Sequence, residues 1–97
     1  MPNSKLRKVI KAPDVLLQDL EGEAVLLNLV NGQYYGLDES SYDMYNTLVS
    51  SSSVQDAYEF LCREYEVEPS QLRADLDQFL KHLLENGLLI YADDQPD

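Results

Sequence analysis

The sequence predicts an α+β fold in which a three-stranded antiparallel β-meander is followed by three α-helices. The first half carries short apolar runs separated by glycine-containing pairs, and the second half carries apolar residues at helical spacing. Its 97 residues, 44% hydrophobic and 26% charged, are typical of one globular domain. We expect a flexible basic arm over 1–12, the folded domain over 13–91 and an acidic tail over 92–97.

Three apolar runs make up the predicted meander, and each has the length of a single strand. They are VLLQDL (15–20), EAVLLNLV (23–30) and QYYGL (33–37). The Asn-Gly pair at 31–32 is the strongest short hairpin signal, because a type I′ turn needs positive φ at both central positions. The Glu-Gly pair at 21–22 is a weaker form of the same signal. A two-residue turn at 31–32 would pair Val30 with Gln33.

This register decides which side chains share a face of the sheet, since alternate residues of a strand point to the same side. One face would carry Leu27, Leu29 and Tyr34, and the other would carry Leu26, Asn28, Tyr35 and Leu37. Both faces are partly apolar, so helices or a partner should cover part of each. Tyr34 and Tyr35 point to opposite faces, so at most one of them can face a given pocket.

The second half predicts three helices from their caps and apolar stripes. Asp38 can cap the first helix, which carries Tyr42, Tyr45, Leu48 and Val49. Ser53 and Asp56 fit a capping box for the second helix. That helix carries Val54, Tyr58, Leu61, Cys62 and Tyr65 on one face.

The third helix is the longest of the three expected helices. Pro69 suits its first turn, and Asn86-Gly87 is a typical left-handed stop. Its apolar stripe spans about 140° at 100° per residue and consists of Leu72, Leu76, Phe79, Leu80, Leu83 and Leu84. Asp75 and His82 flank this stripe beside Phe79. The closing GLLIY (87–91) either adds a short strand or packs as an extended tail.

Three short helices beside a meander resemble a winged helix-turn-helix, which raises the hypothesis of a DNA-binding regulator. The charge opposes it: the chain carries −11 overall and −15 from Ala12 onward, so its body repels phosphates. On the third helix, the basic side chains are outnumbered by carboxylates. The basic arm could still bind nucleic acid alone, through Lys5, Arg7, Lys8 and Lys11.

The outer strands of the predicted sheet differ in how their edges are protected. The run 15–20 follows Pro13 and Asp14 and is interrupted by Gln18 and Asp19, whereas 33–37 carries neither charge nor proline. An unprotected edge suits β-augmentation, in which an extended peptide adds a strand. Alternatives are that the edge is covered by 87–91 or by the N-terminal arm, or pairs with a second copy in a structural subunit.

The sequence offers little for catalysis or metal binding, so we expect no enzyme activity, no cofactor and no metal site. Cys62 is the single cysteine and His82 the single histidine; we interpret the first as a structural thiol and the second as a solvent-edge or groove residue. No apolar run approaches the ~20 residues that span a bilayer, and the start has no signal-peptide core. These observations predict a cytoplasmic protein without membrane contact.

Several stretches taken in order resemble the PqqD-like family. They are LLNLVNGQYYGLDESSYDMYNTL, CREYEVEP and DLDQFLKHLLENGLL, and together they span roughly residues 15 to 91. The family pattern has a leucine-rich strand, a turn with Gly, a Tyr-Tyr-x-Leu strand and an acidic or polar helix cap. An aromatic residue follows in the first helix, often Trp in relatives and Tyr45 here. The front strands are more similar to stand-alone proteins of lasso-peptide pathways than to members of the PQQ pathway.

The resemblance implies a RiPP recognition element, a non-catalytic winged helix-turn-helix protein that binds the leader of a ribosomally made, post-translationally modified peptide. The leader adds a strand at the third strand, lies against the third helix and is presented to a leader peptidase or a radical SAM enzyme. Lasso-peptide biosynthesis is the favoured pathway, followed by the PQQ type. The protein would be a monomer or weak homodimer. The implied peptide-binding residues are Gln33, Tyr34, Tyr35, Gly36, Leu37, Leu72, Asp75, Leu76 and Phe79.

Overall fold

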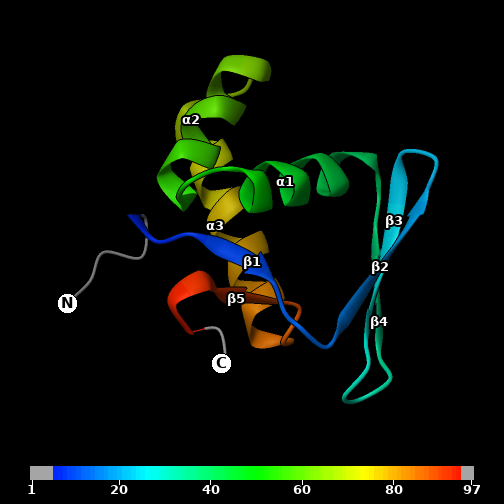
Figure 1. The fold of residues 1–97 in the computed structure, drawn as a ribbon. Coiled ribbons are helices and arrows are strands. Elements are labelled where there is room, and N and C mark those ends of the chain that lie inside the picture. Colours follow the sequence, from blue (N-terminus) through cyan, green and yellow to red (C-terminus); the bar gives the residue numbers. More distant parts are fainter. Residues whose placement is uncertain (1–5, 95–97) are drawn as a thin grey trace.

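The computed structural model describes residues 6–94, so parts of the predicted arm (1–5) and tail (95–97) lie outside the described residues. The predicted meander and three helices are present, together with a second, two-stranded sheet (Figure 1). The elements are β1 (Val9–Lys11), β2 (Val15–Leu20), β3 (Glu23–Asn28), β4 (Tyr34–Leu37), α1 (Glu39–Ser50), α2 (Val54–Glu64), α3 (Pro69–Glu85), β5 (Leu89–Tyr91) and a 3₁₀ turn (Ala92–Asp94). The fold is α+β and of the winged helix-turn-helix type, as predicted.

The sequence analysis gave the Asn-Gly pair at 31–32 as the stronger signal for a two-residue turn, but the structure has this turn at the Glu-Gly pair, 21–22. Glu21 (φ +56°) and Gly22 (φ +98°) form the two-residue turn, and Leu20 pairs with Glu23. The Asp19 carboxylate accepts a hydrogen bond of 3.0 Å from the Glu21 amide, which offsets part of the cost of a left-handed Glu. The Glu-Gly signal was therefore underrated.

The loop between β3 and β4 has five residues, 29–33, and Gly32 alone of its residues has positive φ. The Asn28 amide donates to the Gln33 carbonyl (2.9 Å), and the Asn28 side-chain oxygen accepts from the Val30 amide (2.9 Å). The side chain thus replaces the backbone contacts of a tight turn. Leu27 pairs with Tyr34, so the predicted register was wrong by two positions.

A shift of two positions leaves every side chain on the face that was predicted for it, because the strand period is two. The inner face is buried beneath the helices and carries Val15, Ala24, Leu26 and Leu37. Helix α1 crosses this face and contacts β3 and β4. In Figure 1 all three helices lie on one side of the β2-β3-β4 sheet, so its outer face lacks a covering layer among residues 6–94.

The predicted helix signals are confirmed. Asp38 accepts a hydrogen bond from the Ser41 amide (2.9 Å) at the start of α1, which lowers the pKa of its carboxyl group. Ser53 accepts from the Asp56 amide (3.1 Å) at the start of α2, and Pro69 occupies the first turn of α3. Gly87 (φ +70°) ends α3, where the Leu88 amide donates to the Leu83 carbonyl. Each signal acts within four or five residues, which is why sequence suffices to find it.

Strand β1, which the sequence analysis assigned to the N-terminal arm, pairs antiparallel with β5. Val9 and Leu89 are buried on the inner side of this ribbon. The Lys8 ammonium donates to the carbonyls of Val49 (2.7 Å) and Ser51 (2.9 Å) at the end of α1. Of the two alternatives for residues 87–91, the short strand is correct.

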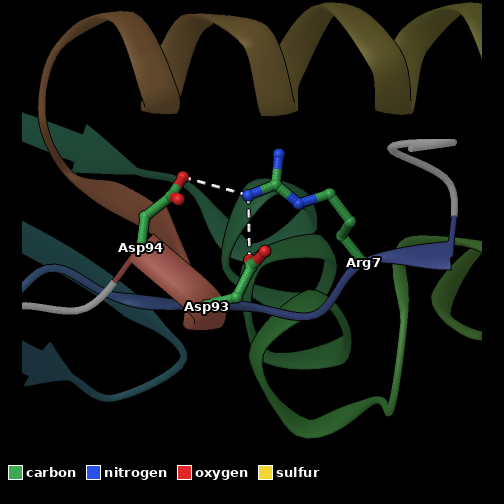
Figure 2. A network of polar contacts seen from close by, with 3 residues as sticks. All are labelled: Arg7, Asp93 and Asp94. Carbon is green, nitrogen blue, oxygen red and sulfur yellow. Dashed lines mark hydrogen bonds and ion pairs between the residues drawn. The ribbon is translucent and has the colours of Figure 1, made fainter. Parts of the chain in front are cut away.

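An ion-pair clip closes this ribbon at its outer end (Figure 2). The Arg7 guanidinium donates to Asp93 (2.8 Å) and Asp94 (3.0 Å) and stacks on the Tyr91 ring at 3.7 Å. The hydrogen bond that Arg7 donates to Asp93 lowers the pKa of the Asp93 carboxyl group and contributes most to raising the pKa of Arg7. The clip joins the first and last parts of the described chain.

The first prediction concerns Asn28, which is 7% exposed and whose side-chain amide also donates to the Asn86 carbonyl at 3.1 Å. Asn28→Ala should lower the free energy of unfolding by about 1–3 kcal/mol, because it leaves buried backbone groups without partners. Urea denaturation measures the change. Gln18→Ala, at an exposed position on β2, should shift the value by less than about 0.5 kcal/mol. Equal stability of the two variants would contradict the role given to Asn28.

The second prediction concerns the clip. A carboxylate whose pKa is lowered in the folded state stabilises above its unfolded pKa, and this stability is lost as pH falls through the folded pKa. Arg7→Gln should therefore lower the Tm at pH 7. The difference in Tm between the variant and the wild type should become smaller below a pH of about 4. Arg63→Gln is the control, because Arg63 makes no ion pair within residues 6–94. A pH-independent difference would contradict the assignment.

Candidate functional site

Strand β4 forms one edge of the meander and pairs only with β3 among the described residues. The hydrogen bond from the Asn28 amide to the Gln33 carbonyl fixes the alternation of the ladder. In an antiparallel pair, every second residue bonds across and the ones between point outward. Tyr35 and Leu37 therefore bond to β3, while the N–H and C=O groups of Tyr34 and Gly36 face the open edge.

Two segments of the chain were alternatives for covering this edge, namely residues 87–91 and the N-terminal arm. Both are placed elsewhere, since β5 and β1 pair with each other. Figure 1 shows this ribbon on the helical side of the molecule, away from β4. Within residues 6–94, the edge of β4 is therefore available to an added strand.

A hollow of about 280 Å³ lies between β4 and α3. It is lined by Tyr35, Asp75, Gln78, Phe79 and His82. The Tyr35 and His82 rings lie 5.0 Å apart and are tilted by 46°, so they connect the strand to the helix. Tyr35 and Phe79 are half-buried and Asp75, Gln78 and His82 are exposed, which gives this hollow apolar walls and a polar rim.

A second hollow, of about 210 Å³, shares Asp75 with the first and extends it towards the start of α3. Its other lining residues are mostly apolar: Ser40, Met44, Leu61, Tyr65, Val67, Gln71 and Leu72. The Gln71 side chain donates to the Asp75 carboxylate at 2.9 Å. We refer to these two hollows, which meet at Asp75, together as the groove; their lining residues on α3 span about three helical turns.

The residues predicted for peptide binding occupy three kinds of position. Gln33, Tyr34, Gly36 and Asp75 are exposed, and Tyr35 and Phe79 are half-buried in the groove wall. Leu37, Leu72 and Leu76 are buried, at 2%, 7% and 0% exposure. Leu72 still lines the groove, whereas Leu37 and Leu76 belong to the core.

Several groove residues were missed, and the helix period explains them. Core positions of α3 are Leu72, Leu76, Leu80 and Leu83. The positions that precede them on the neighbouring face are Gln71, Asp75, Phe79 and His82, and all four line the groove. His82 was interpreted from the sequence as a solvent-edge or groove residue, and a search for the stripe beside the core stripe would also have found Gln71. Met44, Tyr65 and Val67 come from other elements, so no local pattern marks them.

The tyrosines near the groove are structural. Burial raises the pKa of Tyr45 to about 12, which places this first-helix aromatic residue in the core. The Tyr65 hydroxyl donates to Asp43 at 2.8 Å, and this bond raises the pKa of Tyr65.

Cys62 is half-buried on α2. Within residues 6–94, His, Cys, Asp and Glu side chains form no group of three that could hold a metal ion, and no helix is long and apolar enough to span a membrane.

Comparisons with known proteins agree with this geometry. Two solved structures have the same fold, each with a TM-score of 0.76. TbiB1 in complex with the TbiA(beta) leader peptide is 27% identical, and the match covers 91% of this chain and 99% of that one. Lasso peptide synthetase B1 complexed with the leader peptide is 26% identical, with 86% and 98% covered.

No curated protein matches this chain by sequence. A protein-family model does match, over residues 23–89, and its description is coenzyme PQQ synthesis protein D, PqqD. The match begins at β3 and ends in β5, so it includes β4, α3 and the groove between them. The chain therefore belongs to the PqqD family.

Proposed function

We propose that this protein binds the leader segment of a ribosomally synthesised precursor peptide. The leader adds a strand to the edge of β4 and lies against α3, and the protein presents it to a modifying enzyme or a leader peptidase. The observation that carries the proposal is the open edge of β4 beside a groove with apolar walls. The peptide-binding residues are those predicted from the sequence, with Leu76 supporting the groove from below.

The comparisons support this proposal. Both similar structures are complexes with a leader peptide, and this chain covers nearly all of each. One of them is a lasso peptide synthetase subunit, so lasso-peptide biosynthesis is the favoured pathway and a PQQ-type radical SAM pathway the next. The role is that of a non-catalytic adaptor, acting in the cytoplasm as a monomer or weak homodimer.

The energetics require both the edge and the groove. Tyr34 and Gly36 offer four outward backbone groups, and four hydrogen bonds at about 0.5–1.5 kcal/mol each give about 2–6 kcal/mol. Micromolar affinity needs about 8 kcal/mol after the costs of association. Because side chains alternate along a strand, the leader residue opposite Tyr35 points towards α3 and its hollow. Apolar side chains of the leader that point to this side of the added strand supply the remaining free energy of binding.

The winged helix-turn-helix fold raised DNA binding as an alternative, and the placement of the basic residues disfavours it. Arg7 pairs with Asp93 and Asp94, and Lys8 bonds to two carbonyls at the end of α1. The Lys11 ammonium donates to the Val15 carbonyl. These three cations of the predicted basic arm are engaged by the protein itself.

The third prediction tests strand addition. Gly36→Pro should abolish leader binding, because it removes an outward N–H and places a ring in the path of the added strand. Isothermal titration with the leader of a precursor identified among the neighbouring genes measures the affinity. Gly36→Ala is the control, since a Cβ there meets nothing within 4 Å and the N–H is kept. If the proline variant, shown to be folded by circular dichroism, keeps wild-type affinity, strand addition is wrong.

The fourth prediction tests the groove with a matched pair of phenylalanines. Phe79 lines the hollow on α3, whereas Phe60 is 44% exposed on α2 and contributes to neither part of the groove. Phe79→Ala should weaken leader binding about tenfold or more, which corresponds to about 1.4 kcal/mol. Phe60→Ala should leave the affinity unchanged. Backbone amide shifts on titration should concentrate in 33–37 and 70–83, and a uniform response would contradict the assigned site.

A further inference from the structure

The outer face of the β2-β3-β4 sheet is apolar although no element of residues 6–94 covers it (Figure 1). Leu16, Leu27 and Tyr34 are paired in one row across the three strands. Leu16 is 55% exposed and Tyr34 74% exposed. Leu20 (50%) and Leu29 (54%) extend the apolar surface at its ends, and Val25 lies in the adjacent row. Exposed Gln18 is the polar side chain of that row, between Leu16 and Leu20 on β2. An exposed apolar surface of this extent marks an interaction site.

The charged side chains of the sheet itself all have one sign, and the nearby Lys11 ammonium donates to the Val15 carbonyl at the start of β2. Residues 12–62 contain neither Lys nor Arg, so the whole sheet and α1 lack a basic side chain. Exposed Glu21 and Glu23 lie at the end of the face near the β2–β3 turn. A partner with an apolar patch and Lys or Arg at its rim is complementary to this surface. A second copy would instead bring the same acidic rim against itself.

The outer face is continuous with the edge of β4, because Tyr34 contributes its side chain to the face and its backbone to the edge. In an added strand, the residues opposite Tyr34 and Gly36 point to this same outer side. A bound leader would therefore widen this outer face by one strand. Gly36 has no side chain, and the space above it is open, which leaves room for a leader side chain or for the partner.

We infer that the outer face of the sheet docks the enzyme that acts on the bound leader, through an apolar patch of that enzyme with a basic rim. The inference rests on the proposed leader binding and adds to it the surface used by the partner. It also predicts coupling: the enzyme binds the leader-loaded protein more tightly than the free protein, because the leader completes the docking surface.

The test uses the full chain, its leader peptide and a purified processing enzyme, both identified from the neighbouring genes. Leu16→Ser/Leu20→Ser changes two exposed residues of β2, the strand farthest from the β4 edge. Leader affinity, measured by fluorescence polarisation, should stay within twofold of wild type. Affinity for the enzyme, measured by biolayer interferometry on the leader-loaded protein, should fall at least tenfold. The control Leu6→Ser/Phe60→Ser changes two exposed apolar residues outside the sheet and should leave both unchanged.

A charge variant keeps the test decisive if the double serine variant fails to fold. Glu23→Lys, on the outer face, should weaken enzyme binding, and Glu59→Lys on the exposed side of α2 should not. Unchanged enzyme affinity in the sheet variants overturns the inference while leaving leader binding intact. A wild-type dimer in sedimentation that the serine variant dissociates also overturns it, since the face would then serve self-association. Absence of leader binding in the wild type would instead refute the proposed function.

Discussion

The pairing of β1 with β5 is the constraint on which the rest of this molecule depends. Both strands have only three residues, and Val9 and Leu89 are buried beneath them. Each strand comes from a segment that had the length to pair with β4 instead. Because they pair with each other, the meander keeps an edge whose outward N–H and C=O groups belong to Tyr34 and Gly36. The unpaired edge of β4 therefore follows from the pairing of β1 with β5 on the other side of the fold.

Much of the fold follows from local chemistry and is predictable from the sequence. The caps at Asp38 and Ser53, the first-turn Pro69 and the stop at Gly87 each depend on hydrogen bonds between near neighbours. The turns were harder, because the Asn-Gly rule ignores competing side chains. The Asn28 side chain bonds within the loop that follows β3, so a five-residue loop replaces the expected tight turn.

The candidate site was predictable only in part. The absence of charge and proline in 33–37 indicates the unprotected edge, and helix periodicity indicates the apolar face of α3. Periodicity alone did not separate the groove residues of α3 from its core residues. Leu76 fell in the predicted set although it is fully buried, while His82, which shares a helix face with Asp75, lines the hollow. Pairing of β1 with β5 joins residues about 80 positions apart, and no local pattern signals it.

The clip that holds Arg7 against Asp93 and Asp94 places the two ends of the described chain side by side. Both lie on the helical side of the molecule, away from β4 (Figure 1). A domain with adjacent ends opposite its working edge can be tethered to another polypeptide, or inserted into one, without obstructing that edge. The same architecture is thus compatible with a free-standing adaptor and with a module fused to the catalyst it serves.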